Sequence, residues 1–179
     1  MKTIRIQSQQ FSGTEWITRL SQGGYSVTAP AKEVLEYCSR NFVTTFIQGG
    51  FYDLAIIDGK QFSDSERTIK SIYERGSQYG YRVPSDDVGP TLRVSISDKE
   101  ITALGFEELL VMHRPIEKFR KVCPALFAVG RGDDSDNGPV LSSYCSCWYD
   151  RGHTWPVNMG FVFVAPVAST ALMEIQEGE

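Results

Sequence analysis

Four strand-like runs joined by short connections occupy the C-terminal part of this chain, and they constrain its fold more than any other feature. The runs are Leu109 to His113, Ala125 to Val129, Val140 to Tyr149 and Phe161 to Ala165. A parallel crossover needs a dozen or more residues, so the short connections among the last three runs favour antiparallel pairing. We therefore expect the C-terminal part of the sheet to be an antiparallel meander.

The N-terminal part of the chain alternates between strand and helix patterns. Lys2 to Gln7 alternates polar and apolar residues, as a half-buried strand does. A short helix is predicted around Trp16 and Leu20, opened by Thr14 and ended by Gly23. A second helix has Pro30 in its first turn and an apolar stripe formed by Ala31, Val34, Leu35 and Cys38.

Two capping boxes predict further helices in the middle of the chain. Ser63 and Glu66 have the spacing of a capping box, and Gly80 is placed to end the helix that would follow. Ser97 and Glu100 repeat this spacing before a shorter helix. The polar stretch between them, from Pro84 to Pro90, is interpreted as a loop.

A hairpin is predicted where two β-rich runs, Phe42 to Ile47 and Phe51 to Ile57, are separated by Gln-Gly-Gly. The last residues, Ala171 to Glu179, form a frayed helix or a tail in this interpretation. A chain of 179 residues fits one domain. The predicted fold is thus a single α+β domain over residues 1–179, with N-terminal helices packed on a mixed sheet.

Charge and composition exclude several classes of function. The net charge is -4, and residues 121–179 carry three basic side chains against seven acidic ones, so a phosphate-binding stripe for nucleic acid is unfavourable. No apolar run approaches the ~20 residues that cross a bilayer, and residues 1–10 do not resemble a signal peptide. We expect a soluble cytoplasmic protein whose four cysteines stay reduced.

Aromatic residues gather in one segment near the C-terminus and suggest a binding surface. Tyr144, Trp148 and Trp155 lie within twelve residues of one another, and tyrosine and tryptophan are enriched where proteins meet partners. The alternative is that these rings are part of the core. Our first hypothesis is a non-catalytic protein-binding or regulatory domain that uses the loop Tyr144–Trp155 against a protein partner or a second copy of the chain.

The second hypothesis is a small hydrolase or transferase. Its candidate residues are His113, Arg114, Asp150 and His153, which would converge in a cleft where a histidine acts as general base and Arg114 binds an anionic group. The alternative for His113 is a structural histidine at the end of a strand. The two hypotheses differ in whether these side chains share one pocket.

No cofactor or metal site is predicted. Cys145, Cys147 and His153 offer metal-ligating atoms, but a single C-x-C lacks the paired spacing of zinc sites. Strand alternation also puts both cysteines on the same face as Leu141 and Tyr149, where core residues are expected. The acidic stretch Asp133 to Asp136 lacks the glutamate that an EF-hand loop requires. The sequence contains no glycine-rich phosphate loop and no G-x-S-x-G nucleophile motif.

Overall fold

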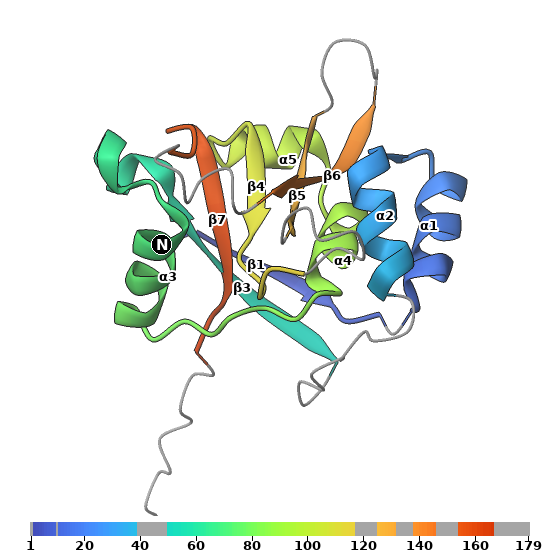
Figure 1. Cartoon of the computed structure of the whole chain (residues 1–179), viewed down its shortest axis with the longest axis horizontal. Helices are drawn as coiled ribbons and strands as arrows, with labels where there is room; N and C mark the ends of the chain where they lie inside the picture. The colour runs from blue at the N-terminus through green and yellow to red at the C-terminus, as the bar shows by residue number, and fades with distance from the viewer. Residues whose placement is uncertain are drawn as a thin grey trace, which may run out of the picture.

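The computed structural model describes residues 2–9, 11–38, 50–116, 125–131, 138–145 and 154–166. Within these ranges one seven-stranded sheet has helices on both faces (Figure 1). The strands are β1 (Lys2–Gln7), β2 (Ser26–Val27), β3 (Phe51–Asp58), β4 (Glu108–Val111), β5 (Ala125–Arg131), β6 (Pro139–Cys145) and β7 (Met159–Val164). The helices are α1 (Gly13–Gln22), α2 (Ala29–Cys38), α3 (Ile69–Gln78), α4 (Val88–Ser95) and α5 (Asp98–Ala103), with short 3₁₀ turns at Gly59–Gln61 and Asp64–Glu66.

The order of the strands is β1-β3-β7-β4-β5-β6-β2, and the sheet is mixed. The pairs β4–β5 and β5–β6 are antiparallel, which confirms this part of the predicted meander. The expected place of the last strand was wrong, because β7 lies between β3 and β4 and runs parallel to β4. The chain from Cys145 to Met159 is long enough for such a crossover, whereas the prediction treated this connection as short.

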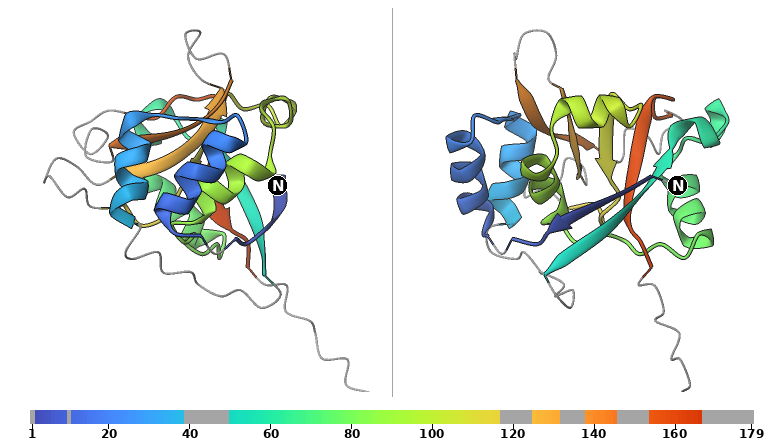
Figure 2. Two further views of the ribbon diagram at one scale, coloured as in Figure 1. Left: turned by 90° about the vertical axis from the view of Figure 1, so that its right-hand side faces the viewer. Right: turned by 180° about the vertical axis from the view of Figure 1, so that it is seen from behind.

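The two faces of the sheet are buried against different helices. Helices α1, α2, α4 and α5 cover one face, where Trp16, Leu35 and Leu92 are fully buried. Helix α3 covers the other face over β3 and β7, and Ile72 packs there with Phe161. Views from the side and from behind show α1 and α2 grouped at the β6 end of the sheet, with α3 at the opposite end (Figure 2). The predicted α+β class is therefore confirmed, with α2 packed directly against β6.

Side-chain caps determine where several helices begin. Ser97 and Glu100 form the predicted capping box at the start of α5, and Gly105 follows that helix with a positive φ of 83°. Ser63 and Glu66 also form a capping box, but it opens a 3₁₀ turn, and α3 begins only after the Thr68 cap. The first helix starts at a capping box formed by Ser12 and Glu15, so the expected opening at Thr14 was two residues late.

Helix α4 was absent from the sequence prediction. It begins at Val88, inside the stretch that was interpreted as a loop, and Pro90 is tolerated because it stands in the first turn. The buried guanidinium of Arg93 fixes the helix by donating to the Asp98 carboxylate at 2.7 Å and to the carbonyl of Gly130 at 3.0 Å. Charged side chains are rarely this buried unless they are paired, and this one is.

The predicted hairpin around Gly50 lies partly outside the described residues. Only its second arm, β3, is described, and its edges are occupied by β1 on one side and β7 on the other. The first arm, Phe42–Ile47, and the predicted tail, Ala171–Glu179, lie outside the described residues. Among the helices that the structure describes, none has the length and apolar character to cross a bilayer.

Candidate functional site

The aromatic anchor is a set of four residues on the α3 side of the sheet: Arg67, Glu108, Tyr144 and Trp155. Tyr144 projects from β6, and its ring meets the Trp155 ring edge-on with centroids 5.6 Å apart. Trp155 is 1% exposed and belongs to the core under α3, whereas Tyr144 is partly exposed. Such edge-to-face pairs contribute about 0.5–1.5 kcal/mol beyond the area they bury.

Arg67 holds the backbone of Trp155 in place. Its Nε donates to the Trp155 carbonyl at 2.6 Å, and the Trp155 N–H donates back to the Arg67 carbonyl at 2.9 Å. The same guanidinium also bonds the Phe62 carbonyl and the Asp64 carboxylate. One buried arginine thus connects the segment around Trp155 to the residues that precede α3.

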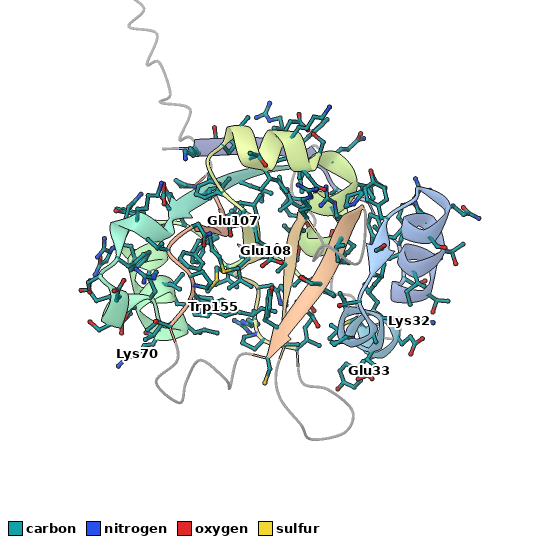
Figure 3. All side chains as sticks on the ribbon, turned by 90° about the horizontal axis from the view of Figure 1, so that it is seen from above. Lys32, Glu33, Lys70, Glu107, Glu108 and Trp155 are labelled. Carbon is teal, nitrogen blue, oxygen red and sulfur yellow. The ribbon has the colours of Figure 1, made fainter. Side chains whose placement is uncertain are left out.

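Glu108 holds the Tyr144 side of the anchor. Its two carboxylate oxygens accept from the Tyr144 hydroxyl at 2.8 Å and from the Ser142 hydroxyl at 2.9 Å. Figure 3 shows Glu108 and Trp155 on the inner side of the molecule between α3 and the β5–β6 strands, while Lys32 and Glu33 lie on α2 beyond those strands. Tyr144 and Trp155, which lie on either side of the segment 146–153, are therefore fixed to the core.

The structure describes two of the three residues of the predicted binding surface. Trp155 was proposed as a surface residue, but its ring is core, because α3 and the strands beneath it enclose it. Tyr144 lies on the face of β6 opposite Leu141, as strand alternation predicts. Trp148 lies outside the described residues.

His113 is a buried, neutral histidine at the end of β4. Its Nε2 accepts the Phe127 N–H at 2.9 Å, which leaves the proton on Nδ1, and Nδ1–H donates to the Arg114 carbonyl at 2.8 Å. Burial lowers the pKa of His113 to about 4, although the Arg114 carbonyl opposes this shift. Both ring nitrogens are bonded to backbone, so His113 is a structural histidine at the end of a strand, which was the alternative given for it from the sequence.

The other members of the predicted cleft are not brought together with His113 by described contacts. The Arg114 side chain is exposed, and Asp150 and His153 lie outside the described residues. An open depression of the surface does occur elsewhere, along α1. It is lined by Phe11, Thr14, Glu15, Thr18 and Arg19, none of which was a candidate.

A pair of carboxyl groups, Asp86 and Asp87, lies beside His113 and was not predicted as a site. Asp86 Oδ1 is 3.7 Å from His113 Nδ1. Burial, followed by the charge of Asp87, raises the pKa of Asp86 to about 6. Asp87 is 1% exposed and accepts from the hydroxyls of Ser85 and Tyr52. The acidic stretch before Pro90 was visible in the sequence, but nothing there indicated that β4 ends beside it.

The cysteines differ in state. Cys38 is a buried free thiol whose pKa burial raises to about 12, so it is protonated and poorly nucleophilic near neutral pH. Cys145 is disulfide-bonded, with its partner outside the described residues, and the expectation of a reduced thiol was wrong for this residue. Cys123 and Cys147 also lie outside them. No group of three or more metal-ligating side chains occurs in the described parts of the chain.

The chain was compared with protein-family models, curated proteins and solved structures. No family model, no curated protein and no solved structure matches the chain.

Proposed function

We propose that this protein is a non-catalytic protein-binding or regulatory domain whose contact surface is the segment Tyr144–Trp155. The observation that carries the proposal is the aromatic anchor, which fixes both flanks of this segment to the core. Binding residues are often carried on loops that a rigid scaffold positions. The segment itself contributes Trp148, a residue type enriched at interfaces.

The residues of the proposed surface have different roles. Trp155 is an anchor and not a contact residue, since its ring is buried. Trp148 is the contact residue of this proposal, and Tyr144 serves both purposes because it is partly exposed. The proposed partner is a protein or a second copy of the chain, and the net charge of -4 disfavours nucleic acid.

The test compares alanine substitutions of two aromatic residues. Trp148→Ala is expected to abolish binding of the protein partner, measured by quantitative affinity capture. It is also expected to abolish any concentration-dependent dimer, measured by sedimentation. Tyr79→Ala is the matched control, because Tyr79 is 44% exposed at the end of α3 and lies outside the proposed surface. Equal capture and equal dimerisation by both folded variants would refute the proposal.

The alternative function is a small hydrolase or transferase, and one observation favours it. Asp86 is a carboxyl group whose pKa of about 6 suits general acid–base catalysis near neutral pH, and its side chain is 29% exposed. In this alternative Asp86, and not His113, moves the proton, and the exposed Arg114 binds an anionic group. Asp86→Asn should then abolish turnover in an ester and phosphate-ester screen, while a screen without turnover by the wild type would count against it.

A further inference from the structure

Cys145 is the last residue of β6, and it is disulfide-bonded. The chain has four cysteines, and Cys38 is a buried free thiol. The partner of Cys145 is therefore Cys123 or Cys147, both of which lie outside the described residues. With either partner, the covalent attachment begins three positions before Trp148, the contact residue of the proposed function.

The bond lies at an accessible end of β6. Cys145 is partly exposed, whereas Val140 and Leu141, nearer the start of the strand, are buried. Thiol–disulfide exchange requires a thiolate to attack one of the two sulfur atoms, so access helps to determine which disulfides are labile. Cys38 is a poor candidate to take over the bond, because it is 3% exposed and burial raises its pKa to about 12.

The sheet holds β6 in place without this bond. The strand pairs with β5 at seven positions, from Ala125↔Cys145 to Arg131↔Pro139, and with β2 on its other side. Ala125 is also fixed from the far side, because it exchanges two backbone hydrogen bonds with Ile116, at 2.9 and 3.0 Å. Neither hydrophobic core of the described residues contains Cys145. Breaking the bond should therefore alter the end of β6 and not the global fold.

The backbone pair of Leu126 and Tyr144 reports on this end of the sheet. The N–H of Phe127 points to the other side of β5, where it donates to His113. Because backbone groups alternate along a strand, Leu126 and Tyr144 form a hydrogen-bonded pair of the β5–β6 ladder. Tyr144 directly precedes Cys145, so its amide lies beside the disulfide.

We propose that the Cys145 disulfide is a redox switch, which fixes the end of β6 and the adjoining part of the segment Tyr144–Trp155 when it is formed and releases them when it is reduced. The ordering of the strand end is independent of the proposed binding function, whereas its effect on partner binding rests on that function. A contact surface that is ordered before binding loses less conformational entropy when the partner binds.

The reductant of this switch is a dithiol. Its two sulfur atoms are oxidised to a disulfide, and the two electrons break the S–S bond of Cys145. The two protons of the dithiol pass to the released cysteine sulfurs, so two thiols replace the bond. Loss of the covalent constraint increases the number of conformations open to the strand end.

Amide hydrogen exchange of the wild type in oxidised glutathione and in dithiothreitol tests the switch. Reduction should lower the protection of the Tyr144 amide about tenfold, because the strand end then opens locally. Protection of the Val140 amide, at the other end of β6, should stay constant. Cys145→Ser should show the low Tyr144 protection under both conditions. Cys38→Ala is the matched control and should keep the full redox response, since Cys38 is not bonded.

Two outcomes would overturn the proposal. One is equal protection of the Tyr144 amide in the oxidised and the reduced wild type, a comparison that needs no variant to fold. The other is a Cys145 peptide without a link to Cys123 or Cys147, found by mass spectrometry after the oxidised protein is alkylated in denaturant. Neither measurement involves a partner, so the switch can fail while Trp148→Ala still abolishes binding, and the reverse can also be observed.

Discussion

Arg67 shows how one side chain sets the local structure around the aromatic anchor. It is 7% exposed, and its guanidinium bonds two backbone carbonyls and one carboxylate that come from different parts of the chain. A planar guanidinium presents its donors in a fixed fork, which a lysine ammonium does not reproduce. The position of Trp155 therefore depends on arginine specifically.

We expect Arg67→Lys to destabilise the protein by about 2 kcal/mol, because it leaves buried carbonyls without donors. Arg75→Lys is the matched control, since Arg75 lies over the Phe62 ring in the last turn of α3 without the same buried bonds. Urea denaturation of both variants measures the difference. Equal midpoints for the two would show that the Arg67 bonds contribute little.

At the scale of the elements, close packing explains what local sequence patterns do not. Helix α4 approaches β5 so closely that a Cβ atom on Gly89 would lie 2.6 Å from the Cβ of Phe127. Gly89 does not have a positive φ, so the position does not require the backbone freedom of glycine. It requires glycine because a larger residue would collide with Phe127 of the neighbouring strand. The glycine looked like a loop residue in sequence because this contact is long-range.

Gly89→Ala should therefore destabilise the protein by about 1–3 kcal/mol through overpacking. Gly24→Ala provides a contrast, since Gly24 has open space around it and a φ of 75°, so its cost comes from backbone strain alone. Thermal unfolding of each variant, together with the near-ultraviolet circular dichroism of the aromatic side chains, separates the two effects. A Gly89→Ala protein as stable as the wild type would mean that α4 shifts freely on the sheet.

Elements determined by local interactions were predictable from the sequence, whereas those that depend on long-range contacts were not. The capping boxes at Ser63 and Ser97 are local, and both are present, although the one at Ser63 opens a 3₁₀ turn and not the predicted helix. Helix α4 was missed because a proline and two aspartates near its start match a loop equally well. The pairing of Asp86 with His113 depends on where β4 ends relative to α4, which no local pattern encodes.

At the scale of the whole molecule, the sheet is buried on both faces at its centre. Leu109 and Leu110 are neighbours in β4, yet Leu109 packs under the α4 side and Leu110 under the α3 side, and both are fully buried. Leu109→Ala and Leu110→Ala should each cost about 2–5 kcal/mol. Equilibrium denaturation measures both, and a near-neutral effect for either would show that its face of the sheet is not a closed core.

The position of β7 has a consequence for the synthesis of the chain. Among the described strands it is the last to leave the ribosome, yet it alone of them joins the pair β1–β3 to the group β4–β5–β6–β2. Until Val164 has emerged, the described strands of the nascent chain belong to two separate ribbons, each with an unpaired edge where β7 will lie. Exposed strand edges invite pairing with other chains. The nascent chain is thus most vulnerable to aggregation before β7 emerges, and a chain stopped before Met159 would remain in that state.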